Sequence, residues 1–247
     1  STIDDRNIRS SVQEQLTFVF ENIREQSEEA YWADFVSTRA ILAPKNSDVN
    51  FINSVCVDQL AGEDIVLASA DTTIELDAIN QYPVEYLNTL EHASIPPHRL
   101  VLKKGAVVMC LRNLNKVQGL CNGTRLIVND VSDNKLLKAT VVTGANKERT
   151  VLLPRIKMQP AEFDAFGFGW ERLQFPVKLA FAVTINKSQG QTLSRVSVWL
   201  NDSCFSHGQL YVAASRVGDP LNIKFAIKQK DGLPPNATQN IVYKELL

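Results

Sequence analysis

The segment Arg39-Ala-Ile-Leu-Ala-Pro-Lys-Asn-Ser-Asp-Val-Asn-Phe-Ile-Asn53 decides the fold class. Its apolar run, residues 39–43, is stopped by Pro44, which is typical of a short buried strand that ends in a turn. Ser47 can cap a following helix that carries apolar side chains on one face. A second apolar run follows at residues 65–70, so the order strand, helix, strand predicts an α/β fold.

The segments around this stretch change character along the chain. Apolar side chains recur at helical spacing over residues 11–26, which predicts an amphipathic helix, and Pro83 suits the first turn of another. After Ile95-Pro-Pro97 the pattern changes to short β-rich runs separated by turn residues, as in a small barrel or sandwich. These predicted strands cover residues 100–102, 106–111, 125–131, 136–142 and 150–153.

The α/β pattern returns after Phe175-Pro176. The apolar run 179–185 is interpreted as a buried helix, while residues 196–200 and 223–227 are predicted strands. We therefore expect an α/β domain that is interrupted by a β-rich insert. The predicted boundaries are residues 1–97 for the first part, 98–175 for the insert and 176–247 for the remainder.

The formal net charge of −1 conceals an uneven distribution of charge over the 247 residues. Residues 1–91 hold 17 acidic and 5 basic side chains, whereas residues 92–247 hold 10 acidic and 21 basic ones. The overall pI is therefore a poor guide to the partners of this chain. A polyanionic partner is compatible with the second part only.

Cysteine usage and hydropathy indicate the type of environment. None of the four cysteines, Cys56, Cys110, Cys121 and Cys204, belongs to a CxxC pair, so we expect reduced thiols and no metal site. The start of the sequence has no apolar signal-peptide core, and no apolar stretch reaches the length of a membrane span. We expect a soluble nuclear or otherwise intracellular protein with no membrane partner.

The stretch Thr184-Ile-Asn-Lys-Ser-Gln-Gly-Gln-Thr192 carries groups that suit phosphate and ribose. It combines the cation Lys187 and the hydroxyl of Ser188 with a glycine, Gly190, that allows close approach of the backbone. The alternative is an ordinary polar helix end followed by a turn. Composition alone favours that alternative slightly.

Two other stretches end or begin at positions that suit anions. Arg216 closes the apolar segment Phe205–Arg216, where its planar guanidinium can meet a phosphate. Taken alone, its position favours a cap of the C-terminus of its own helix. Lys45 and Asn46 lie between a strand and a helix N-terminus, as an anion-binding loop or as an ordinary connection.

Basic side chains gather in the β-rich part, including Arg99, Lys103, Lys104, Arg112 and Lys116. Contact with a nucleic-acid backbone is one interpretation, and a solvated basic surface is the other. Aromatic residues are sparse here, so no base-stacking platform is predicted.

Taken together and in order, these stretches resemble the C-terminal half of a Pif-type (petite integration frequency) helicase, a 5′-to-3′ superfamily-one DNA helicase. The resemblance is greatest to the Helitron-like branch. The matching segments are ILAPKNSDVNFIN (41–53), PPHRLVLKKGAVVMCLRNL (96–114), GLCNGTRLIV (119–128), FPVKLAFAVTINKSQGQTL (175–193) and FSHGQLYVAASR (205–216).

The resemblance implies a second RecA-like domain with an inserted Src-homology-type barrel, and a role for each matching residue. It implies that Arg216 is the arginine finger, supported by Gln209. The residues implied to face nucleotide are Gly190, Gln191 and Thr192; those implied to contact single-stranded DNA are Lys45, Asn46, Thr184, Lys187, Ser188, Lys103 and Lys104.

No GxxxxGK[ST] loop occurs in this sequence, so we expect a first RecA-like domain to be supplied in cis or in trans. That domain would bind most of the ATP and its Mg²⁺. The resemblance implies unwinding of DNA, binding of single strands and junctions, and work in repair, recombination or telomere maintenance in the nucleus or mitochondrion. The alternative is a non-catalytic remnant that binds single-stranded nucleic acid.

Overall fold

The computed structural model describes residues 3–27, 31–74, 82–160 and 167–228, together with 234, 237–238 and 241. The chain forms two compact units. The first unit combines Ser1–Leu60 with Ala180–Leu247, and the second consists of Ala61–Leu179. The chain therefore leaves the first unit once and returns to it.

A parallel sheet forms the centre of the first unit. Its strands are β1 (Arg39–Ala43), β12 (Ala182–Thr184), β13 (Arg195–Leu200) and β14 (Ile223–Ile227), in the order β12-β1-β13-β14. All three pairings are parallel. Runs of buried residues in β1 and β13 fit a parallel sheet whose faces are covered.

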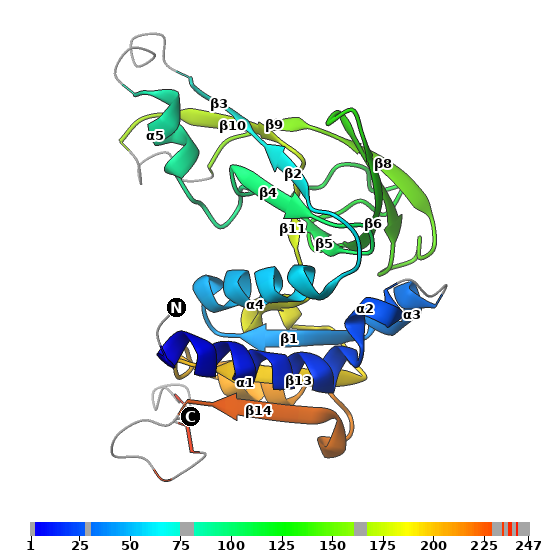
Figure 1. Ribbon diagram of the computed structural model, residues 1–247, viewed down its shortest axis with the longest axis vertical. Helices are drawn as coiled ribbons and strands as arrows, with labels where there is room; N and C mark the ends of the chain where they lie inside the picture. The colour runs from blue at the N-terminus through cyan, green and yellow to red at the C-terminus, as the bar shows by residue number, and fades with distance from the viewer. Residues whose placement is uncertain are drawn as a thin grey trace. The chain divides into compact units, whose positions relative to one another are not determined.

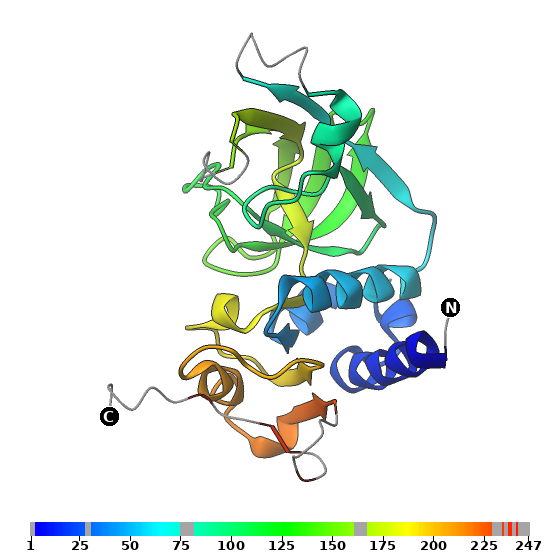
Figure 2. The same ribbon diagram turned by 90° about the vertical axis from the view of Figure 1, so that its left-hand side faces the viewer.

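Helices cover this sheet. The long helices α1 (Ile3–Phe20) and α4 (Asn46–Gln59) contact each other and the strands, and lie alongside β1 in Figure 1. Figure 2 shows α6 (Gln209–Ala214) on the opposite side of the sheet from α1. The unit also contains the short helices α2 (Ile23–Gln26), α3 (Trp32–Ser37), η3 (Ile185–Ser188) and η4 (Pro220–Asn222).

The N-terminal helix is predicted correctly in its buried face but not in its bounds. α1 begins earlier than expected and ends at Phe20, because Glu21 and Asn22 adopt positive φ angles of 23° and 42°. The helix after β1 begins at Asn46 with Lys45 in the capping position. The prediction that Ser47 caps this helix is therefore wrong.

The predicted buried helix at residues 179–185 is wrong as well. β11 (Val177–Leu179) ends there, β12 follows, and the chain then enters η3. A continuous apolar run is equally typical of a fully buried parallel strand, and periodicity cannot separate the two. The side chain of Asn53 on α4 fixes β12 by bonding both the carbonyl and the N–H of Ala182, at 3.0 and 2.9 Å.

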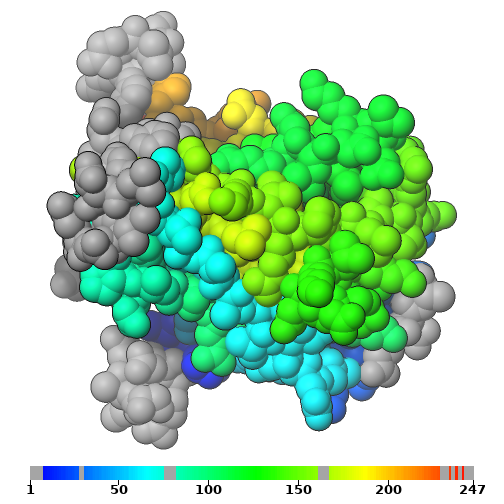
Figure 3. Space-filling model, turned by 90° about the horizontal axis from the view of Figure 1, so that it is seen from above, coloured from blue at the N-terminus to red at the C-terminus, as the bar shows by residue number. Residues whose placement is uncertain are grey.

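The second unit consists mainly of antiparallel strands, as predicted for this region. A five-stranded sheet has the order β11-β5-β6-β7-β8, and smaller sheets pair β2 with β4 and β10 with β3 and β9. The remaining bounds are β2 (Ile65–Ala68), β3 (Ala70–Thr73), α5 (Val84–Thr89), β4 (Arg99–Leu102), β5 (Val107–Cys110), β6 (Arg125–Ser132), β7 (Leu136–Val141), β8 (Thr150–Pro154), β9 (Ile156–Met158) and β10 (Trp170–Gln174). Closure of these strands into a barrel stays a prediction. Figure 3 shows the face that residues 65–74, in cyan, form with the green strands.

The observed boundaries of the units differ from the predicted ones. Residues 61–97 lie in the second unit, because β2 pairs with β4 and β3 pairs with β10. The predicted boundaries place these residues in the α/β part. The short run at residues 65–70 has no local signal that distinguishes a strand of one unit from a strand of the other.

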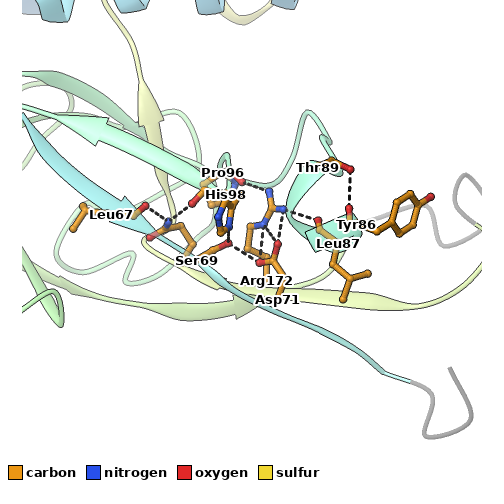
Figure 4. Close-up of polar contacts among 10 residues, drawn as sticks. Leu67, Ser69, Asp71, Tyr86, Leu87, Thr89, Pro96, His98 and Arg172 are labelled. Atoms are coloured by element: carbon orange, nitrogen blue, oxygen red, sulfur yellow. Dashed lines mark hydrogen bonds and ion pairs between the residues drawn. The ribbon is translucent and has the colours of Figure 1, made fainter. Parts of the chain in front are cut away.

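A buried ion pair holds the second unit together (Figure 4). The guanidinium of Arg172 on β10 donates from Nη2 to Asp71 Oδ2 on β3 at 2.6 Å, and both side chains are almost fully buried. The same guanidinium donates to the carbonyls of Pro96 and Leu87 at 3.0 and 3.1 Å. One side chain therefore connects two strands, α5 and the Pro96 turn.

Candidate functional site

Parallel strands place their carboxyl ends at one edge of the sheet, and Figure 2 looks onto this edge in the first unit. The loops that leave it contain most of the predicted site residues. Lys45 follows β1, the stretch that begins at Thr184 starts with the last residue of β12, and Asp202 follows β13. In open parallel sheets this edge is where ligands bind.

The stretch after β12 forms a tight turn around Ser188. Thr184 pairs in register with Ala43, and the chain then makes the single turn of η3. Ser188 is fully buried, and its hydroxyl donates to the carbonyl of Ile185 at 2.7 Å. The structure thus places the Ser188 hydroxyl inside the turn, although it was expected to face DNA, whereas Lys187 is exposed.

Gly190 and Thr192 lie at the surface of the same loop. Gly190 has a φ angle of +79°, which is strained for residues other than glycine. A β-carbon at this position would meet no atom within 4 Å. The space next to Gly190 is therefore open, and the nucleotide-facing role of these residues stays a prediction.

The predicted arginine finger lies against this loop. Arg216 Nη1 donates to the carbonyl of Gln191 at 3.0 Å and to that of Ser188 at 3.4 Å. Its Nε donates to the carbonyl of Val212 at 2.8 Å, one turn back in its own helix. The interpretation of this arginine as a cap of α6 is therefore confirmed, and its contact with a phosphate stays a prediction.

Gln209 is buried at the start of α6. Its Oε1 accepts a hydrogen bond from the N–H of Phe205 at 3.1 Å. Its Nε2 is buried without a hydrogen-bond partner. The side chain therefore holds the loop before α6 and retains one donor that a ligand or a rearranged loop can use.

The loop after β1 brings a cation next to a carboxylate. Lys45 Nζ lies 2.8 Å from Asp202 Oδ2, and the hydrogen bond to Asp202 raises the pKa of Lys45. Asp48 lies in the first turn of α4, where burial first and the charge of Asp202 second raise its pKa. Asn46 begins the helix and is exposed.

Asp202 was not among the predicted site residues. The signal for it was present, because Asp202 comes directly after the predicted strand at residues 196–200. Parallel strands would carry it to the same edge as Lys45, although the two positions are 157 residues apart.

The two predicted lysines of the second unit differ in environment. Lys104 is exposed, beside Gly105 with its φ angle of 84°. The Lys103 side chain is only 11% exposed, and its Nζ lies 3.7 Å from Asp64 Oδ1. Lys104 is therefore the better placed of the two for contact with a polyanion.

A cavity of about 210 Å³ also opens in the first unit, between α1 and the ends of β13 and β14. None of the predicted site residues lines it; its lining is Ile8, Ser11, Trp199, Asn201, Ala226, Ile227 and Lys228. Over the described residues there is no cluster of three or more side chains that could hold a metal ion. Within the same part of the chain, no helix is long and apolar enough to cross a membrane.

Comparison with known proteins gives matches to one class. The family described as "DNA helicase Pif1, 2B domain" matches residues 85–131. The ATP-dependent DNA helicase Pif1 of Bdellovibrio bacteriovorus is 34% identical over 148 residues, which is 60% of this chain and 32% of that protein. The Danio rerio protein of the same description is 36% identical over 143 residues, 57% of this chain and 21% of that protein.

Solved structures agree with the sequence matches. The Pif1 helicase of Candida albicans has a TM-score of 0.58 and 29% identity, over 77% of this chain and 45% of that one. A Bacteroides Pif1 bound to single-stranded DNA has a TM-score of 0.57 and 27% identity, over 77% of this chain and 41% of that one.

The chain is therefore similar to ATP-dependent DNA helicases. Within that class the relatives are of the Pif1 type, and the predicted resemblance to the C-terminal half of such a helicase is confirmed. The chain spans about a fifth to a third of the length of the two curated relatives described above. The Helitron-like branch stays a prediction.

Proposed function

We propose that this chain is the C-terminal motor part of an ATP-dependent 5′-to-3′ DNA helicase that translocates on single-stranded DNA and unwinds duplexes and junctions. The first unit is its second RecA-like domain, and the second unit contains an inserted Src-homology-type barrel. The observation that carries the proposal is the contact of Arg216 with the Gln191 carbonyl, since it joins the two predicted nucleotide-facing segments.

The residues at the sheet edge fit the rim of a nucleotide site. The backbone at Gly190 is open, Thr192 is exposed, and Arg216 is partly exposed beside them. When bound, ATP supplies the phosphoanhydride bond that is hydrolysed, and its phosphates and Mg²⁺ are held mainly by a first RecA-like domain. Arg216 exchanges its contact with the Gln191 carbonyl for the charge that develops on the transferred phosphate, a contribution of about 10³–10⁵ in rate.

Lys45, Asn46, Thr184 and Lys187 bind the DNA strand at the same edge. Lys45 and Lys187 are exposed, so their ammonium groups can displace counterions from phosphates. Ser188 acts differently from the expectation, because its buried hydroxyl shapes the turn that presents Lys187. The second unit contacts DNA through its own exposed Lys104, next to Lys103, whose ammonium lies near Asp64.

The second candidate function is a non-catalytic module that binds single-stranded nucleic acid. The exposure of Lys104 and Lys116, both in the β-rich unit, favours it. Such a module needs neither Arg216 nor a partner domain. Loss of binding on changing the lysines of the second unit alone, with no effect of Lys45 or Lys187, would support it over the helicase.

A salt titration tests the DNA-binding part of the proposal. The chain is mixed with a fluorescent oligothymidylate, and the dissociation constant is measured by anisotropy at several NaCl concentrations. We expect affinity to fall steeply with salt and Lys187→Gln to reduce the logarithmic slope by about 0.7, whereas Lys45→Gln should reduce it by less, because Asp202 already pairs with that ammonium. Absence of binding at low salt would contradict the proposal.

A further inference from the structure

The Lys45–Asp202 pair joins two loops that have different expected partners. Lys45 lies between β1 and α4, in the loop assigned to DNA. Asp202 lies between β13 and α6, the segment that leads to Arg216. The two atoms are 2.8 Å apart, and the side chains are 49% and 43% exposed. The contact therefore forms in open solvent, where a phosphate can reach it.

The charge around Lys45 is not that of a simple phosphate site. Asp202 pairs with its ammonium, and Asp48 lies close enough for its charge to act on Lys45 as well. With both carboxylates ionised, these three side chains carry a net negative charge. An approaching DNA phosphate meets repulsion from the carboxylates together with attraction from the lysine.

We propose that Asp202 sets the affinity of the β1–α4 loop for single-stranded DNA by competing with the backbone phosphate for the Lys45 ammonium. The inference rests on the proposed function, because it assumes that Lys45 meets DNA. Exposed ion pairs are weak, so a phosphate displaces Asp202 and the carboxylate recaptures Lys45 when the strand leaves. A translocating enzyme needs such easily reversed contacts.

The exchange also gives the DNA loop a connection to the nucleotide segment. Whenever DNA occupies Lys45, Asp202 loses this partner, so the segment leading to α6 loses one of its contacts with the β1–α4 region; the hydrogen bond between Asn201 and Asp48 is another. Bound DNA weakens the contact between Asp202 and Lys45 by some factor. By linkage, any event that favours this contact must weaken DNA binding by that same factor.

The test is the isosteric substitution Asp202→Asn in the 247-residue chain. We expect three- to fivefold tighter binding of a fluorescent oligothymidylate at low salt. The logarithmic salt slope should steepen by up to about 0.7, because Lys45 then enters the complex without first leaving a carboxylate. The control is Asp58→Asn, which removes one negative charge from an exposed position on the same helix as Asp48.

A double-mutant cycle separates competition from a general change of charge. In a Lys45→Gln background, Asp202→Asn should change the affinity no more than Asp58→Asn does. Equal effects of Asp202→Asn and Asp58→Asn in the unmodified background, or weaker binding after Asp202→Asn, would overturn the inference alone. Absence of binding by the unmodified chain would overturn the proposed function and this inference together.

Discussion

Arg216 Nη1 donates a hydrogen bond to the carbonyl of Gln191 at 3.0 Å, across 25 positions of sequence. The main chain repeats the connection, since the N–H of Leu193 donates to the carbonyl of Arg216 at 2.8 Å. The end of α6 and the loop after η3 are thereby a single structural element. Whatever moves one of them moves the other.

Arg216→Ala should therefore loosen the loop as well as remove a charge. Hydrogen exchange of the amides at residues 189–193 should accelerate, and the free energy of unfolding should fall by about 1–2 kcal/mol, because carbonyls lose a charged donor. Arg24→Ala, at an exposed arginine of α2, is the control. Unchanged exchange in this loop would show that Arg216 does not hold it.

Asp71→Ala should be the most damaging of the single substitutions considered, because it leaves the Arg172 guanidinium buried without its carboxylate. We expect a loss of about 3–5 kcal/mol in the free energy of unfolding. Replacing both partners, as in Asp71→Leu with Arg172→Met, should cost less. Urea denaturation compares the variants, and a loss below about 1 kcal/mol for Asp71→Ala would contradict this account of the buried pair.

Asp48 should give stability a dependence on pH. Burial raises the pKa of Asp48 in the folded state above its ordinary value of 3.8. The folded chain therefore holds the proton of this carboxyl more tightly than the unfolded chain does. Stability from this group is present at low pH and is lost as pH rises through the raised pKa. The unmodified chain should therefore lose stability relative to Asp48→Asn over the pH interval just above 3.8. A difference that grows in the opposite direction would contradict the raised pKa.

The thiols should react in an order set by burial. Burial raises the pKa of Cys110 to about 12 and also raises the pKa values of Cys56 and Cys204. Cys121 is only half-buried. Iodoacetamide at pH 8 should therefore modify Cys121 first, because the thiolate is the reactive form and must be accessible. Mass spectrometry of the peptides decides the order, and earlier modification of Cys56 would contradict it.

Much of the fold can be predicted from the sequence, because the strands differ from the rest of the chain in composition. The strands at residues 39–43, 196–200 and 223–227 have those bounds within one residue, and the β-rich region was recognised from its turns. The predicted helix at residues 179–185 is wrong because the local pattern is ambiguous there. The predicted unit of residues 61–97 differs from the observed one because pairing with distant strands decides it.

The candidate site was predictable in part for the same reason. Lys45 and Lys187 follow strands, so their shared edge follows from a parallel sheet. The burial of Ser188 and the partner of Lys45 depend on contacts between distant segments, which no local pattern contains. Aromatic stacking in the second unit was also missed: Tyr82 and Phe168 stack with ring centroids 3.8 Å apart.

The most direct test of the central claim is a measurement of ATP hydrolysis. The chain is joined in one polypeptide to a first helicase domain that contains a phosphate-binding loop. The measurement compares single-stranded-DNA-stimulated turnover of the unmodified protein, Arg216→Ala and the control Arg24→Ala, with folding checked by circular dichroism. We predict a loss of about 10³-fold or more for Arg216→Ala and none for the control. Turnover by Arg216→Ala within tenfold of the unmodified protein would contradict the assignment of this chain as the half of the motor that supplies the arginine finger.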